Sequence, residues 1–148
     1  MLYVTSAFSL SMVLEAIEKR DVRQAVLEVQ LADPADVREI FQRRLAPTAW
    51  ESAVGHEGTA RVLSEILGVE IPAQRKFVKL QPGDAVLVFQ LYERLPEGKV
   101  LSESEIREIV ERGNWRLVWV VFPAAQDELL GIRDEEEEGE EEICDGQG

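Results

Sequence analysis

The sequence predicts a single α/β domain in which a mixed β-sheet of about five strands is flanked by helices. Its 148 residues are enough for one domain with a substantial apolar core. Short apolar runs with the alternation of strands take turns with stretches whose apolar residues recur at helical spacing. Capping and turn residues separate these stretches, and such an alternation of strands and helices is typical of α/β folds.

In the first half of the chain, two strands and two helices are expected. Residues 2–6 and 26–31 alternate like strands, and between them a serine-rich cap precedes a helix over roughly 12–19. Asp33-Pro34 combines a capping residue with a proline at the first helical position, where proline is favoured. The short helix that follows is expected to stop near Pro47, because proline cannot continue it.

The second half is expected to hold two further helices and three extended runs. One helix follows His56 and ends at Gly68, since glycine is favoured just after a helix C-terminus. The other begins at Ser102, where serine and Glu105 have the spacing of a capping box. The extended runs cover residues 77–80, 84–91 and 115–122. The last run is largely continuous in apolar residues, which is typical of a buried strand.

Charge divides the chain into a domain of residues 1–123 and an acidic tail of residues 124–148. The net charge is −13, and nine of the 29 acidic residues lie in residues 134–148, which contain no lysine or arginine. Such a block of like charge is typical of disordered segments, so we expect the tail to be disordered, with at most a weak helix over residues 124–133 before the acidic block. The other 133 residues carry a net charge of only −4, which excludes a basic protein that coats duplex nucleic acid. A small anionic ligand held by a few arginines remains compatible with this charge.

Targeting and metal-binding signals are missing from the sequence. It has no run of eighteen apolar residues, so no membrane-spanning helix and no membrane partner are expected. The N-terminus lacks a basic region and alternates like a strand, unlike a secretory signal. Cys144 is the only cysteine, which excludes an intrachain disulfide and a Cys/His zinc site. A cytoplasmic location, with no metal and no cofactor, is therefore expected.

His56 is the only histidine of the chain and the first candidate for catalysis. Imidazole is the one side chain that ordinarily gains and loses a proton near neutral pH. Gly55 and Gly58 lie beside it and allow a close approach of backbone or substrate, and the N–H groups of the predicted helix start attract phosphate. A loop histidine without any role is the alternative that this local pattern leaves open.

Three blocks of sequence carry a resemblance to a known family. They are Thr5–Met12, Ser52–Thr59 and Arg94–Ser102, and they follow one another in the family's order. From Leu2 to about Phe122 the chain resembles the viral type III anti-CRISPR ring nuclease family, which also has bacterial members beside type III CRISPR loci. That family degrades cyclic tetra-adenylate, the second messenger of type III CRISPR defence.

The resemblance implies a set of catalytic and ligand-binding residues in this chain. The catalytic set is His56, Arg94 and Glu97, and the ligand-binding set is Ser9, Ser11 and Arg75. The chain departs from the family pattern at Ser6, where asparagine is usual, and in residues 32–50, which are longer than in compact viral members. The acidic tail has no counterpart. Of these departures, only Ser6 concerns the ligand site.

Such a site would cleave the ring with the ribose 2′-OH as nucleophile. His56 would protonate the leaving 5′-oxygen, and Glu97 would orient or deprotonate the 2′-OH. Arg94 would bind the non-bridging oxygens as negative charge builds on them, and Arg75 would hold another phosphate. No metal or cofactor is required, and the expected product is linear di-adenylate with a 2′,3′-cyclic phosphate.

The resemblance also implies a homodimer that holds the ring at its interface, because a four-fold ring and a two-fold dimer both present equivalent sites in pairs. Two other functions stay open. A binding module could sequester the cyclic nucleotide without cutting it, or the acidic tail could mimic nucleic acid and block a basic partner.

The same residues also allow purely structural interpretations. Arg94 and Glu97 could form a surface ion pair of little energetic value, and Arg75 could be an ordinary solvated arginine. Ser9 could be only a helix cap. The three tryptophans, Trp50, Trp115 and Trp119, are expected in the core or at an interface rather than as platforms for nucleobases.

Overall fold

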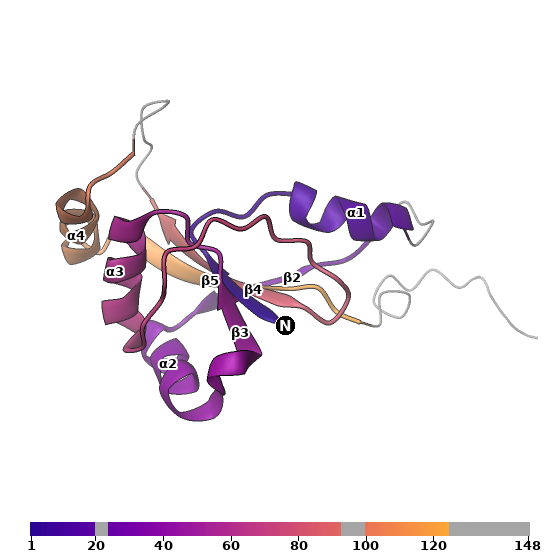
Figure 1. Cartoon of the computed structure of the whole chain (residues 1–148), viewed down its shortest axis with the longest axis horizontal. Coiled ribbons are helices and arrows are strands. Elements are labelled where there is room, and N and C mark those ends of the chain that lie inside the picture. Colours follow the sequence, from indigo (N-terminus) through magenta and orange to yellow (C-terminus); the bar gives the residue numbers. More distant parts are fainter. Residues whose placement is uncertain (20–23, 93–99, 125–148) are drawn as a thin grey trace, which may run out of the picture.

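Five strands form one mixed sheet in the order β2-β5-β4-β1-β3 (Figure 1). The computed structural model describes residues 1–19, 24–92 and 100–124. The strands are β1 Leu2–Thr5, β2 Glu28–Ala32, β3 Trp50–Ser52, β4 Ala85–Leu91 and β5 Trp115–Val121. β1 pairs in parallel with both β3 and β4, whereas β5 is antiparallel to β2 and β4. The predicted α/β class with a mixed sheet of five strands is therefore confirmed.

Helices connect most of these strands, and their ends carry the expected caps. The helices are α1 Ser11–Lys19, α2 Pro34–Glu39, α3 Glu57–Leu67 and α4 Glu103–Glu111, with a π-helical turn Ile40–Arg44 and a short 3-10 helix Pro47–Ala49. The Asp33 side chain accepts from the N–H of Ala35, and Ser102 with Glu105 forms a complete capping box. Gly68 ends α3 in the left-handed conformation, with φ of 74°.

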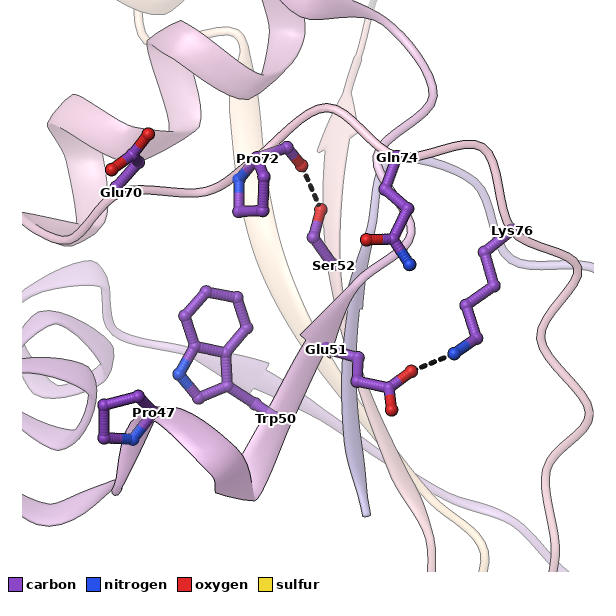
Figure 2. A pocket seen from close by; sticks show the side chains of 8 residues that line it. All are labelled: Pro47, Trp50, Glu51, Ser52, Glu70, Pro72, Gln74 and Lys76. Carbon is purple, nitrogen blue, oxygen red and sulfur yellow. Dashed lines mark hydrogen bonds and ion pairs between the residues drawn. The ribbon is translucent and has the colours of Figure 1, made fainter.

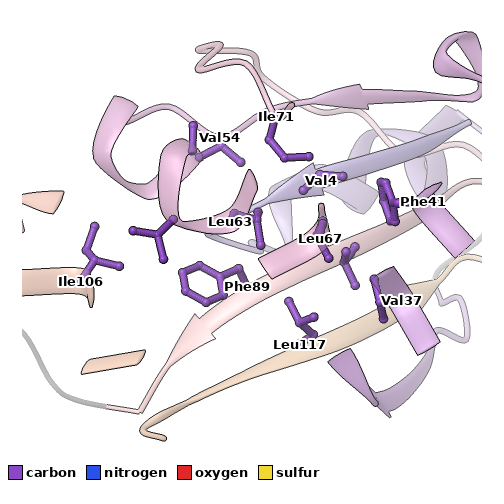
Figure 3. Close-up of a cluster of buried hydrophobic side chains, with 13 residues drawn as sticks. Val4, Val37, Phe41, Val54, Leu63, Leu67, Ile71, Phe89, Ile106 and Leu117 are labelled. Atoms are coloured by element: carbon purple, nitrogen blue, oxygen red, sulfur yellow. The ribbon is translucent and has the colours of Figure 1, made fainter. Parts of the chain in front are cut away.

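The apolar core has two parts, one on each face of the sheet. Neighbouring residues of a strand point to opposite faces, so Leu87 and Phe89 of β4 belong to one part while Val86 and Val88 belong to the other. The first part packs under α2, α3 and α4 and is drawn in Figure 3. The second part packs under α1. Leu67 of α3 is fully buried, so replacing it with alanine would cost about 2–5 kcal/mol of stability.

One predicted extended run is not a strand of the sheet. Residues 77–80 alternate correctly, with Val78 and Leu80 buried and Phe77 exposed, but they lie against helix α1. The N–H of Leu80 donates to the carbonyl of Met12 at 2.7 Å, and Lys79 forms an ion pair with Glu15 at 3.1 Å. The alternation that predicts a strand is therefore explained by packing of one side of the segment on a helix.

The fifth strand is instead β3, which the sequence did not predict. It has three residues, Trp-Glu-Ser, too few for a periodic pattern. Its register with β1 places Tyr3 opposite Glu51, so pairing with β1 creates the strand. β3 forms the edge of the sheet beyond β1, and its position decides where His56 lies.

The acidic tail predicted for residues 124–148 lies, from residue 125 onward, outside the described residues. β5 runs opposite to β4, so the chain leaves the sheet at the end opposite to the carboxyl end of β4. In the part of the chain that the structure describes, no helix is long and apolar enough to cross a bilayer.

Candidate functional site

The carboxyl ends of β1 and β3 bring two of the three sequence blocks to the same end of the sheet. β1 ends at Thr5 and β3 at Ser52, and β4 runs in the same direction to Leu91 (Figure 1). The Ala-Phe-Ser block follows β1, and the glycine-histidine block follows β3. Ligands of open α/β sheets bind outside the carboxyl ends of strands, so this end is the candidate site.

His56 is held at the start of helix α3 without making a cap. Its backbone is extended, with φ of −122° and ψ of 134°, and its carbonyl accepts from the N–H of Ala60 at 3.0 Å. The imidazole makes no capping hydrogen bond and is exposed. Serine, aspartate or asparagine at this position would stabilise the helix by about 1 kcal/mol, so histidine is locally a poor choice. Such local exceptions are typical of functional positions.

Arg75 lies beside the loop that carries His56. The N–H of Gln74 donates to the carbonyl of Val54 at 2.7 Å, and Val54 forms an isolated parallel bridge with Ala73. A Cβ atom on Gly55 would lie 3.5 Å from the Cγ of Arg75, so the arginine side chain passes next to that glycine. Arg75 is exposed, and no carboxylate of the described residues forms an ion pair with it.

A buried hydroxyl holds these two segments together. Ser52, at the end of β3, is 3% exposed. Its hydroxyl donates to the carbonyl of Pro72 at 2.6 Å and accepts from the N–H of Val54 at 3.3 Å. Because the hydroxyl bonds to both segments, the positions of His56 and Arg75 are fixed relative to each other through the backbone.

Ser9 and Ser11 lie at the start of helix α1 and are both exposed. Their hydroxyls are hydrogen-bonded at 2.5 Å, and the Ser9 hydroxyl accepts from the N–H of Ser11 at 3.2 Å. The Ser9 carbonyl accepts from the N–H of Met12 at 3.0 Å. Ser9 therefore does serve as a helix cap, which was its structural interpretation, and its exposed hydroxyl leaves room for a ligand contact as well.

Arg94 and Glu97 lie outside the described residues. The chain before them is described to Tyr92, whose N–H donates to the carbonyl of Asn114 at 2.9 Å. The chain after them enters α4, whose first residue, Glu103, packs against the first turn of α3. A Cβ atom on Gly58 would lie 3.1 Å from the backbone nitrogen of Glu103, closer than nearly all such contacts. Gly58 thus permits this approach, a packing role that its position beside His56 did not reveal.

Charged residues on the outer side of α3 and α4 form a separate group, the α3–α4 charge cluster: Arg61, Glu65, Glu103 and Arg107. Arg107 bonds to both oxygens of Glu65, at 2.5 and 2.6 Å, and to Glu103 at 2.6 Å. These hydrogen bonds lower the pKa of both carboxyl groups and raise the pKa of Arg107.

In the described chain no group of histidine, cysteine and acidic residues is large enough to hold a metal ion.

Comparisons with known proteins connect this chain to archaeal viruses. It is 45% identical over 71 residues to protein 26 of Sulfolobus islandicus filamentous virus, covering 48% of this chain and 60% of that protein. It is 34% identical over 91 residues to the ORF117 protein of Acidianus two-tailed virus, covering 62% of this chain and 75% of that protein. A bacterial relative, YddF of Bacillus subtilis, is 32% identical over 59 residues, covering 40% of this chain and 55% of that protein.

The fold has a solved counterpart in B116 of Sulfolobus turreted icosahedral virus. The TM-score is 0.59 at 26% identity, over 81% of this chain and 97% of B116. The chain covers about three fifths of the length of the first viral relative and nearly all of B116. The family model described as STIV B116-like matches residues 2–112, and the chain belongs to that family.

Proposed function

We propose that this protein is a metal-independent ring nuclease that cleaves cyclic tetra-adenylate and so switches off type III CRISPR signalling. One observation carries the proposal: at the carboxyl ends of parallel strands, an exposed histidine without a cap bond stands beside an arginine that forms no ion pair with any described residue. Membership of the family of B116, together with relatives from archaeal viruses, supports a role in the contest between virus and host.

In the proposed reaction, the ribose 2′-oxygen attacks the neighbouring phosphorus and the bond from phosphorus to the 5′-oxygen breaks. The 2′-OH gives its proton to Glu97, and the leaving 5′-oxygen takes a proton from His56. Arg94 stabilises the charge on the non-bridging oxygens. The roles of Arg94 and Glu97 rest on the resemblance, whereas the exposure of His56 and the nearness of Arg75 are structural support.

The substrate and the proposed assembly share a symmetry. Two cuts on opposite sides of a four-fold ring yield two linear di-adenylates, each with a 2′,3′-cyclic phosphate. A homodimer with one copy of the site on each subunit would place two such sites on opposite sides of the ring. We therefore include a homodimer with the ring at its interface in the proposal.

Comparison of wild type with His56→Ala tests the proposal and separates it from sequestration without cleavage. General acid catalysis contributes about 10²–10⁴-fold, so the variant is expected to cleave the ring slower by that factor while binding it nearly as tightly. Binding is measured by titration and cleavage by chromatography of products. Equal binding with no cleavage by wild type would indicate a sequestering module, and cleavage by the variant at the wild-type rate would exclude His56 as the acid.

A further inference from the structure

The open edge of β3 carries a hollow that the proposed cleavage chemistry does not use. Its volume is about 660 Å³, within the range of ligand sites in proteins. β3 pairs with β1 on one side. On the other side, the segment 70–76 is held by the hydrogen bond from the Ser52 hydroxyl to Pro72 and by the β-bridge between Val54 and Ala73. The backbone of that segment forms no β-bridge with Trp50 or Glu51, and the hollow lies between it and these residues (Figure 2).

One side of the hollow is aromatic and apolar. Trp50 is partly buried, and its indole packs edge-to-face on Phe41, with ring centroids 5.4 Å apart and an interplanar angle of 68°. This contact fixes the orientation of the indole, and Pro72 lines the hollow above it (Figure 2). A rigid indole in an open hollow is a suitable surface for stacking a flat heterocycle.

The opposite side is polar and carries hydrogen-bonding groups. Glu51 and Lys76 form an ion pair there, and Gln74 lies beside them (Figure 2). Within the described chain, the side-chain amide of Gln74 makes no hydrogen bond. Glutamine and asparagine amides pair with adenine through two hydrogen bonds, because both present one donor and one acceptor side by side.

The charge of the hollow disfavours a phosphate as its occupant. Its charged lining residues are Glu51, Glu70 and Lys76, and the lysine is already paired with Glu51. The remaining carboxylate of Glu70 repels an anion but accepts hydrogen bonds from an amino group. A neutral base that carries an exocyclic amino group fits this combination.

The hollow and the candidate site are next to each other in the chain, because a residue that lines the hollow directly precedes a residue of the site. Gln74 precedes Arg75, whose side chain passes Gly55 next to His56. Neighbouring Cα atoms are about 3.8 Å apart, so the side chains of Gln74 and Arg75 leave the backbone close to each other. We propose that the hollow between Trp50 and Gln74 is a subsite for the adenine base of a nucleotide whose phosphate lies on Arg75, and this subsite rests on the proposed function for its physiological ligand.

The test uses adenosine 5′-monophosphate as the probe and the indole N–H resonances of the full chain as the readout. Only three tryptophans are present, and the resonance that disappears in Trp50→Phe belongs to Trp50. Adenosine 5′-monophosphate is expected to shift this resonance, whereas ribose 5-phosphate, which lacks the base, is expected to leave it in place. Uridine 5′-monophosphate should bind more weakly, because it has no amino group for Glu70.

Gln74→Ala is expected to weaken binding of adenosine 5′-monophosphate about tenfold or more, as loss of a two-bond contact to adenine does. Gln30→Ala is the matched control, because Gln30 is an exposed glutamine on β2, at the opposite edge of the sheet. An unmoved Trp50 resonance at every concentration of the nucleotide overturns the subsite, as does an equal shift with ribose 5-phosphate.

The same measurements separate the subsite from the ring-nuclease proposal. If the Trp50 resonance does not move but wild type cleaves the ring, the subsite is wrong and the nuclease stands. If the resonance shifts with the nucleotide but the ring is neither cleaved nor bound, the subsite is right and the proposed function is wrong.

Discussion

The α3–α4 charge cluster and the candidate site at the strand ends both contain charged or ionisable side chains, but only those of the cluster are paired with each other. In the cluster, Arg107 is bonded to Glu65 and Glu103, and each charge meets its counter-charge inside the protein. At the strand ends, His56 and Arg75 are exposed, and neither forms an ion pair with a described residue. Charged groups that are already paired with each other bind an added ligand only weakly. Polar groups without such a partner, on loops at the ends of strands, can instead bind a ligand.

Arg75→Ala is expected to cause the largest loss of binding among the following substitutions. A hydrogen bond between charged groups contributes about 1.5–3 kcal/mol, so binding of cyclic tetra-adenylate is expected to weaken about 10–150-fold. Arg75→Lys should recover only part of this, because lysine lacks the two-pronged guanidinium. Titration with the ring measures both variants, and Arg43→Ala, at an exposed arginine of the π-helical turn, is the control. If Arg75→Ala binds like the control, Arg75 is a solvated surface residue.

His56→Asn should separate the two regions by moving stability and cleavage in opposite directions. Asparagine caps a helix and histidine here does not, so the variant is expected to be more stable by about 1 kcal/mol in denaturant titration. It should also lose cleavage, since asparagine cannot donate the required proton. A variant that cleaves normally, or that is less stable than wild type, contradicts the description of His56 as a functional residue at a poor capping position.

Arg107→Ala should change stability only, and in a pH-dependent way. Arg107 lowers the pKa of Glu65 and Glu103 in the folded state, so their pairing stabilises the protein above the unfolded carboxyl pKa of about 4.3. That contribution is lost as the pH falls through the lowered folded pKa values. The melting temperatures of variant and wild type should therefore differ slightly near neutral pH and converge in acid. Ring cleavage should be unchanged, and a loss of cleavage would place the cluster in the site.

Truncation after Arg133 should have the smallest effect. The removed residues contain nine carboxylates and no cation, so they repel an anionic ring instead of attracting it. The shortened chain is expected to cleave as fast as the full chain, or slightly faster at low salt, where repulsion is not screened. Rates at two salt concentrations measure this. Loss of cleavage or of the dimer would show that the tail belongs to the functional unit.

Elements with their own local signals could be predicted from the sequence. Three such signals predict where a helix begins or ends, and the structure confirms all of them: Asp33-Pro34, Gly68 and the Ser102 capping box. β3 could not be predicted, because its three residues become a strand only by pairing with β1. Residues 77–80 show the opposite case, since their alternation is real but its buried side faces helix α1.

The candidate site was predictable only in part, because some of its contacts depend on pairing between distant segments and not on a local sequence pattern. His56 stood out as the one histidine beside two glycines, and a helix does begin directly after it. The position of Arg75 beside the His56 loop depends on the bridge between Val54 and Ala73, and no local sequence pattern predicts that bridge. Trp50 was expected in the core, and its contact with Phe41 agrees, but the hollow beside it depends on where segment 70–76 returns to the sheet.

Incubation of the purified full chain with cyclic tetra-adenylate in excess EDTA tests the ring-nuclease proposal most directly. The expected result is complete conversion of the ring to linear di-adenylate with a 2′,3′-cyclic phosphate, resolved by chromatography, at a rate that added Mg²⁺ does not change. An intact ring, or cleavage that appears only when Mg²⁺ or Mn²⁺ is restored, would contradict a metal-independent reaction carried by His56.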